Sequence, residues 1–180
     1  MKQVDSTNPK AHQNMRTLMS QFHGGKEHSL AERFRMHLIG MYSATTGPEW
    51  SSNGMSEGDI VHHINVNLSG RRQVVFRGKV HHLEPGEAWL LPAHTPVERR
   101  CEETCEIVFF KFFCECLPGV DPLLDWKGRE PRRMCAIDPA EWRSWLANDK
   151  PPGISSILGL RGRLLWWMVR TIPELDDVIT

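Results

Sequence analysis

The residues with the clearest chemistry alternate along one short stretch, residues 62–68 (HHINVNL). Because successive side chains of a strand point to opposite faces, His63, Asn65 and Asn67 share one face and three aliphatic side chains share the other. Imidazole and amide groups form hydrogen bonds, and each buried amide without a partner costs about 1 to 3 kcal/mol. If this face is buried, its hydrogen-bond partners are ligand hydroxyls, water or neighbouring backbone groups. If the partner is a ligand, the amides favour a sugar.

A lysine stands in a second strand-like run, residues 106–116 (EIVFFKFFCEC). Lys111 lies between Phe109 and Phe113 on one face of this run, and the other face is apolar throughout. A strand that is apolar on both faces is covered on both sides. The ammonium group of Lys111 either binds a ring oxygen, a hydroxyl or an acid group of a ligand, or extends to the mouth of the fold.

Two tryptophans and one histidine are further candidates. Trp50 and Trp89 are suited to stacking on a sugar, because the C–H edges of a pyranose complement an aromatic ring. Core packing is the commoner role of tryptophan, and it is the alternative at both positions. His94 lies in a turn and either contacts a ligand or stabilises that turn.

The sequence excludes several other chemistries. It contains no phosphate-cradling loop and no nucleophile elbow. Its five cysteines are an odd number, and their spacings CxxxC and CxC fit neither a disulfide framework nor a zinc ribbon. We expect reduced thiols that pack as small apolar groups.

The overall charge is balanced. The 180 residues include 22 basic and 22 acidic side chains, so the formal net charge is zero. This argues against a surface that as a whole binds nucleic acid or anionic lipid. The N-terminus has no apolar core region and the chain has no long apolar run, so we expect a cytoplasmic protein with no membrane partner.

The elements that position the candidate residues are short strands separated by glycines. Strand patterns occur in five runs: residues 34–43, 62–68, 74–76, 80–83 and 106–116. Gly70, Gly78 and the Pro85-Gly86 turn separate the middle runs. Short strands with this spacing predict a mainly β fold, a sandwich or barrel over residues 30–117.

Helical segments flank the predicted barrel. Residues 1–29 are polar and predict an N-terminal arm, and residues 118–180 predict a connector followed by two helices. Asp138 and Pro139 have the residue types that begin a helix. The last helix carries one apolar stripe, formed by Ile157, Leu158, Leu164, Leu165, Met168 and Ile172. Both helices need an apolar surface, and the aliphatic face of residues 64, 66 and 68 is the candidate.

The segment PGEAWLLPAHTP, preceded by the LSG that ends the central strand, resembles the second motif of the cupin superfamily. Gly86 and Pro92 fit the spacing of that motif, but His94 stands where a glycine is usual and Val97 stands where the metal-binding histidine is usual. Counting back from the glycine after the central strand puts His63 at the glutamate position of the first motif, and no histidine pair precedes it. The resemblance implies a cupin-like double-stranded β-helix. Because the usual metal-ligand positions carry other residues, we expect no metal or other cofactor.

The order of arm, barrel and two helices over residues 30–172 is similar to the effector-binding and dimerisation domain of arabinose-regulator (AraC-type) transcription factors. The resemblance implies a barrel that binds a sugar or other small effector, an arm that closes over it, and a homodimer. Such regulators continue into a helix-turn-helix domain that contacts DNA. This chain ends at Thr180 without one, so we expect a fragment of a longer regulator, with a stand-alone sensor as the alternative.

The resemblance also implies roles for individual residues. Its register turns His63, Asn65, Asn67 and Arg99 into the barrel, and Lys111 takes the position of a ligand-stacking aromatic residue in the arabinose-binding relative. The predicted ligand-binding set is Trp50, His63, Asn65, Asn67, Trp89, His94, Arg99 and Lys111. The predicted dimerisation residues are Leu158, Leu165 and Met168.

We therefore expect a ligand-sensing, dimer-forming domain of a transcriptional regulator rather than an enzyme, with a sugar or sugar acid as its effector. The alternative is a stand-alone cupin enzyme, a sugar isomerase or epimerase that uses His63 and Lys111 as acid and base. A third interpretation is a scaffolding barrel whose lumen is filled by its own side chains.

Overall fold

The computed structural model describes residues 34–51, 59–124, 129–147 and 153–172. The predicted N-terminal arm lies outside these residues. The elements in chain order are β1 (Arg35–Thr46), the 3₁₀ turn η1 (Pro48–Trp50), β2 (His62–Ser69), β3 (Arg72–Phe76), β4 (Lys79–Leu83), β5 (Glu87–Leu91), β6 (Glu98–Cys101), β7 (Cys105–Glu115), β8 (Arg132–Ala136), α3 (Pro139–Leu146) and α4 (Ile154–Thr171).

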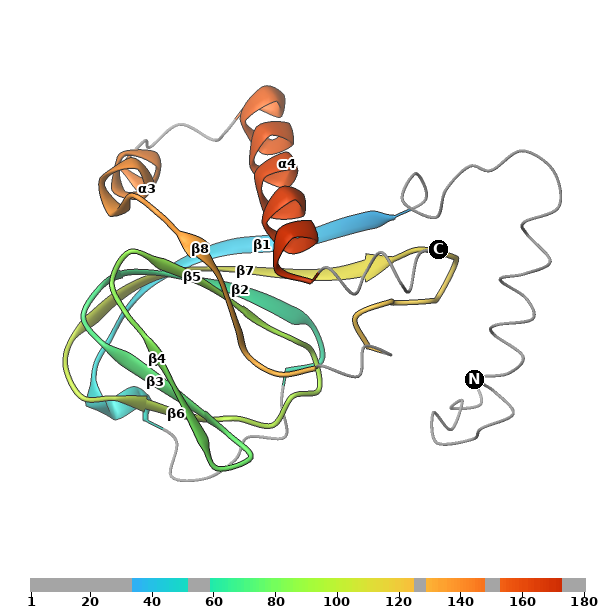
Figure 1. Ribbon diagram of the computed structural model, residues 1–180. Coiled ribbons are helices and arrows are strands. Elements are labelled where there is room, and N and C mark those ends of the chain that lie inside the picture. Colours follow the sequence, from blue (N-terminus) through green and yellow to red (C-terminus); the bar gives the residue numbers. More distant parts are fainter. Residues whose placement is uncertain (1–33, 52–58, 125–128, 148–152, 173–180) are drawn as a thin grey trace, which may run out of the picture.

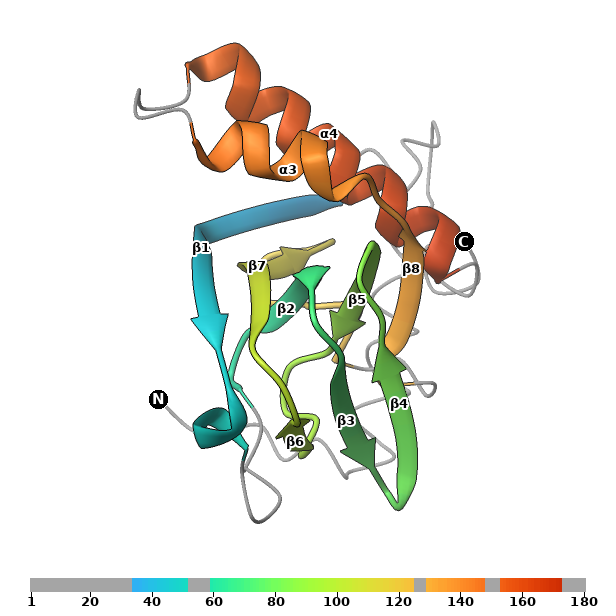
Figure 2. The ribbon, with the colours of Figure 1, turned by 90° about the vertical axis from the view of Figure 1, so that its left-hand side faces the viewer.

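The strands form two antiparallel sheets that face each other (Figures 1 and 2). The larger sheet has the order β1-β7-β2-β5-β8, and the smaller sheet has the order β4-β3-β6. The chain passes repeatedly from one sheet to the other, which is the connectivity of a jelly-roll barrel. The predicted fold, a cupin-like double-stranded β-helix followed by two helices, is confirmed.

The helices α3 and α4 lie over the outer face of the larger sheet, on the side away from β3, β4 and β6 (Figure 1). The aliphatic side chains of β2 are buried in the same apolar cluster as Trp142 of α3 and Trp167 of α4. The aliphatic face of the central strand therefore packs beneath the helices, as the alternation predicts.

Two arginines fix the helices to the sheet. Arg143 of α3 donates from Nη2 to the carbonyl oxygen of Leu68 (3.1 Å) and from Nε to the carboxylate of Glu106 (2.9 Å). Arg161 of α4 donates to the carbonyl oxygen of Met36 in β1 (2.8 Å). Helix α3 begins as predicted, with the Asp138 carboxylate accepting a hydrogen bond from the backbone N–H at position 140 (2.9 Å).

The barrel extends beyond residue 117, the end expected from the sequence. Part of the predicted connector forms β8, which pairs with β5 and makes the second edge of the larger sheet. The breakers Pro118, Pro122 and Pro131 lie before this strand and hide it in the sequence pattern. Among the described helices, none is long and apolar enough to span a membrane.

The apolar stripe of α4 divides between two sides of the helix. Leu160, Leu164, Trp167 and Met168 are buried against the sheet, whereas Leu158 is 59% exposed. The predicted role of Met168 in dimerisation is therefore wrong, because its side chain is fully covered by the barrel's own core. Leu165 is partly buried at the edge of this core.

A pair of substitutions tests this placement of α4. Leu164→Ala should lower the free energy of unfolding by about 2 to 5 kcal/mol, because it leaves a cavity in the core. Leu158→Ala should change it by less than about 0.5 kcal/mol, because the side chain is exposed. Urea unfolding of both variants measures the difference, and equal losses would show that the helix is rotated from the described position.

Candidate functional site

The polar face of β2 points into the barrel. Its aliphatic residues pack under the helices, so His63, Asn65 and Asn67 lie on the opposite, luminal side. Asn65 pairs in register with Trp89 of β5, and Trp89 belongs to an apolar cluster with Val74 of the facing sheet. The predicted inward orientation of these three side chains is confirmed.

The luminal apolar side chains form two separate clusters rather than one core. One cluster consists of Val74, Phe76, Leu83, Trp89, Leu91 and Val97. The other consists of Cys101, Cys105 and Ile107, with Ala44 and Phe109 packed against them. Much of the remaining inner wall is polar, as expected of a ligand site with a few polar groups among apolar walls.

Four charged or titratable side chains meet at the His63 position. Asp59 Oδ2 lies 2.7 Å from Arg99 Nη2 and 3.6 Å from His63 Nε2. Lys111 of β7 is the cross-strand neighbour of His63, and its ammonium lies 5.7 Å from the ring centre of Tyr42. Asp59 thus brings the predicted residues His63 and Arg99 together, and Lys111 lies beside His63 on the neighbouring strand.

Burial keeps the His63 imidazole neutral. Desolvation lowers the pKa of His63 to about 4, Asp59 opposes this shift, and the positive charges of Lys111 and Arg99 add to it. At neutral pH the ring therefore carries one proton and offers one donor and one acceptor. Its plane is stacked on Phe109 with ring centres 6.1 Å apart, which fixes its orientation.

The neighbouring histidine, His62, has a hydrogen-bond partner on each ring nitrogen. His62 accepts a hydrogen bond at Nδ1 from the backbone N–H of Ala93 (2.8 Å), so its proton is on Nε2, which donates to Asp121 (2.9 Å). Asp121 also accepts from the backbone N–H groups of Cys114 (3.2 Å) and Leu123 (2.9 Å). His62 is a satisfied structural histidine, whereas His63 is available to a ligand.

Several buried polar atoms on the luminal wall have no hydrogen-bond partner among the described residues. They are His63 Nε2, Asn65 Nδ2, Asn67 Oδ1, Arg72 Nη1 and His81 Nε2. Such atoms are rare in folded proteins because each one loses its hydration without compensation. Their grouping on one inner surface indicates a polar occupant of the lumen.

Asn67 differs from the other two polar residues of β2. Its Nδ2 donates to the carbonyl oxygens of Gly70 (2.7 Å) and Leu83 (2.9 Å). Gly70 has a φ of +69°, and a Cβ there would lie 2.5 Å from the carbonyl oxygen of Thr104. The amide nitrogen of Asn67 therefore holds a tight turn, and only its Oδ1 has no partner among the described residues, so the predicted ligand contact of Asn67 is limited to that oxygen.

The aromatic and turn candidates Trp50, Trp89 and His94 do not join the polar side chains around His63. Trp89 is 7% exposed within the apolar core, and its indole N–H donates to Glu87 (2.9 Å). Trp50 is 57% exposed on η1, and His94 is exposed in a turn with a φ of +52°. For Trp89 and His94 the packing and turn alternatives describe the observed positions better than ligand contact, and exposed Trp50 lies outside the cluster.

The sequence pattern missed two members of the site. Arg72 belongs to an Arg71-Arg72 pair that resembles a solvated charge pair, yet it lies two residues before buried Val74 and shares its inward face. This two-residue spacing from Val74 was the feature of the sequence that could have identified Arg72. Asp59 precedes β2 in an irregular segment, where no periodicity indicates the direction of a side chain.

The cupin fold implies a metal centre, and the residues of this chain do not fit one. Val97, at the position of the usual metal-binding histidine, is 2% exposed within an apolar cluster. His63 has Asp59 as its carboxylate neighbour, and among the described residues no group of three or more His, Cys, Asp or Glu side chains converges. A stable site needs three or four such ligands.

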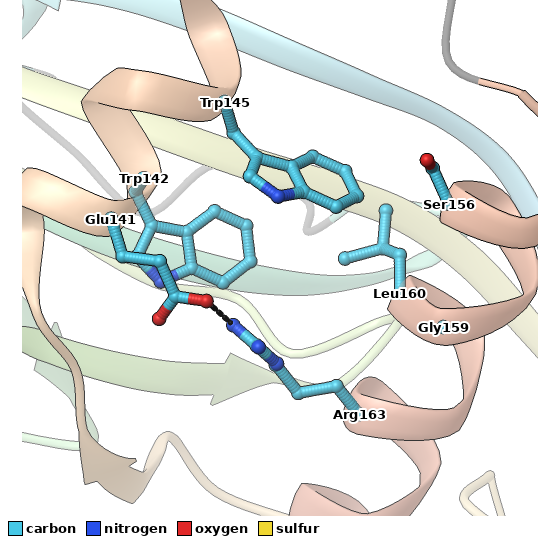
Figure 3. A pocket seen from close by; sticks show the side chains of 7 residues that line it. All are labelled: Glu141, Trp142, Trp145, Ser156, Gly159, Leu160 and Arg163. Carbon is cyan, nitrogen blue, oxygen red and sulfur yellow. Dashed lines mark hydrogen bonds and ion pairs between the residues drawn. The ribbon is translucent and has the colours of Figure 1, made fainter.

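A hollow lies outside the barrel, between α3 and α4 (Figure 3). It has a volume of about 160 Å³ and is lined by Glu141, Trp142, Trp145, Ser156, Gly159, Leu160 and Arg163. Its two charged side chains pair with each other at 2.7 Å. One buried lining atom, Trp142 Nε1, lacks a partner among the described residues, against five on the luminal wall. The lumen is therefore the stronger candidate.

Comparisons with known proteins found solved structures of low similarity. No family model and no curated protein matches the sequence. A cupin-2 domain containing protein from Shewanella frigidimarina is 16% identical, and the match covers 53% of this chain and 96% of that chain with a TM-score of 0.35.

Two further solved structures come from regulators. The cupin_2 domain of an XRE family transcriptional regulator from Enterobacter cloacae is 14% identical, with 44% of this chain and 95% of that chain covered and a TM-score of 0.33. An HTH_3 family transcriptional regulator from Vibrio cholerae is 16% identical, with 44% of this chain but half of that chain (50%) covered and a TM-score of 0.34. At such scores the fold assignment rests on the strand order of this chain itself.

The neutral state of buried His63 predicts a pH dependence of stability. The folded-state pKa of about 4 lies below the ordinary value of 6.5, so the unfolded chain takes up the proton first as the pH falls. The contribution is fully present above about pH 6.5 and is lost down to about pH 4, by on the order of 3 kcal/mol. Urea unfolding between pH 7.5 and pH 4 should show a steeper loss for the wild type than for His63→Gln. His82→Gln, which replaces an exposed histidine of β4, is the control, and a wild-type slope in His63→Gln would contradict the burial argument.

Proposed function

We propose that the chain is the effector-binding and dimer-forming domain of an AraC-type transcriptional regulator, with a small polar effector bound in a metal-free barrel. The observation that carries this proposal is the set of unpartnered polar atoms on the inner wall, above all His63 Nε2 and Asn65 Nδ2. Hydroxyl groups both donate and accept, so a sugar or related hydroxylated molecule supplies the missing partners. DNA contact belongs to a separate helix-turn-helix domain, and the protein acts in the cytoplasm.

Binding in this proposal changes a conformational equilibrium and makes or breaks no covalent bond. The effector shifts the protein toward the arrangement that it binds more tightly, and the difference in affinity is the whole signal. Couplings of this kind are typically about 1 to 3 kcal/mol.

An exposed apolar stripe on α4 supports pairing between two copies. Positions 158, 162, 165 and 169 follow spacings of four, three and four residues, as in the seam of a coiled coil. Leu158 and Val169 are 59% and 55% exposed. At Gly162 no atom lies within 4 Å of the place of a Cβ, so a second helix has room to approach closely.

The second candidate function, a sugar isomerase or epimerase, rests on the cross-strand pair His63 and Lys111. An acid and a base on adjacent strands have the required proximity. However, a histidine whose pKa is about 4 is a weak base at neutral pH. This favours recognition over catalysis.

The effector site is tested by Asn65→Leu. This change removes a luminal amide and should abolish the thermal stabilisation by any sugar that stabilises the wild type, while the fold persists. Gln73→Leu is the matched control, because Gln73 lies on the opposite face of β3 and bonds to Glu102 outside the barrel. A thermal-shift screen followed by calorimetry measures both variants. Unchanged binding by Asn65→Leu would remove the lumen as the effector site.

The pairing surface is tested by Leu158→Asp. A buried carboxylate in a helix seam is costly, so this variant should sediment as a monomer while the wild type sediments as a dimer. Arg170→Asp, an exposed change away from the stripe, should remain dimeric. A dimeric Leu158→Asp variant, or a monomeric wild type, would contradict pairing through α4.

A further inference from the structure

Positive charge exceeds negative charge on the luminal wall. Among the described residues, the inward positions carry the cations Arg72, Arg99 and Lys111, and Asp59 is already bound to Arg99 at 2.7 Å. The other carboxylate near the lumen, Glu87, accepts from the Trp89 indole and from the side chain of residue 133 at the rim. Two cationic side chains, Arg72 and Lys111, therefore have no carboxylate within ion-pair distance in the described part of the chain.

Of these two cations, Arg72 gives the stronger evidence for a partner from outside the chain. It opens β3 between Leu83 of β4 and Cys101 of β6, and its Nη1 is buried without a partner among the described residues. Burial lowers the pKa of the guanidinium, and the neighbouring charge of Arg99 adds to this. Arg72 is partly buried, and Cys101 and Cys105 oppose the lowering of its pKa. A buried guanidinium nitrogen without a partner is nevertheless costly, so its retention points to a partner that is supplied from outside.

We propose that the occupant of the lumen is an anion, a small hydroxylated carboxylic acid whose carboxylate is bound by Arg72 with Lys111 as the second positive charge. This rests on the proposed function and narrows its ligand class. A guanidinium donates two parallel hydrogen bonds to a carboxylate, which both neutralises the charge and fixes the orientation of the ligand. The hydroxyl groups of such an acid then pair with Asn65 and His63. A neutral sugar leaves Arg72 uncompensated.

Pairs of compounds that differ in the acid group test the proposal. Sodium galacturonate and sodium gluconate are compared with galactose and glucose by thermal unfolding at pH 7.5, with sodium chloride holding the ionic strength constant. At least one acid should raise the melting temperature by about 5 °C at saturating concentration, and its neutral parent should not.

Arginine variants assign the effect to the lumen. Arg72→Gln and Lys111→Gln should each abolish the rise caused by the acid. Arg71→Gln should keep it, because the adjacent Arg71 side chain is 77% exposed. In chloride alone, Arg72→Gln should melt at the wild-type temperature or above it, since the change removes an unpaired buried charge. A large fall would show that the guanidinium is paired within the protein.

The outcomes separate the ligand class from the function. If neutral sugars stabilise the wild type through Asn65 and the acids do not, the acid class is wrong and the effector site stands. If an acid stabilises the Arg72→Gln variant as well as the wild type, the assignment to Arg72 is wrong. If neither acids nor sugars stabilise the wild type, both this inference and the sugar-like effector are overturned.

Discussion

The register of β2 between β5 and β7 determines what the protein has on each side of its larger sheet. With this register, three aliphatic side chains enter the core under α3 and α4, and His63 and Asn65 enter the lumen. A slip of one residue would exchange the two sets, placing amides under the helices and leaving the lumen apolar. Burying unpaired amides under the tryptophans of the helices would be costly. This cost therefore determines which face of the sheet the helices cover and which residues line the lumen.

The two faces of the larger sheet differ in how completely their polar groups are hydrogen-bonded. On the helix side the main polar groups at the contact are paired: Arg143 binds the sheet twice and Arg161 binds β1. On the luminal side, by contrast, two amides, two imidazoles and a guanidinium each keep a buried atom that has no partner among the described residues. Core packing accounts for most of the first surface, where Trp142 Nε1 is the buried atom left without a partner among the described residues. The second surface has the unpartnered groups on which the proposed effector site rests.

Alternation in the sequence was enough to predict β1 to β4 and β7 and the two faces of β2, and the cupin resemblance supplied the inward direction of His63, Asn65 and Lys111. It failed where the deciding contact comes from a distant segment. Asn67 shares the parity of Asn65, but only the turn at Gly70 and the carbonyl of Leu83 show that its amide is occupied. Met168 lies in an apolar stripe, and the stripe alone does not tell which side meets the sheet.

The alternation of luminal and core positions also bears on how such a barrel diversifies. Odd-numbered positions of β2 and β7 set the chemistry of the lumen, and even-numbered positions of the same strands maintain the hydrophobic contacts with the helices. A single substitution at position 65 or 111 changes the polarity of the lumen without removing a core side chain. The chemistry of the lumen and the stability of the fold can therefore evolve almost independently within one strand pair.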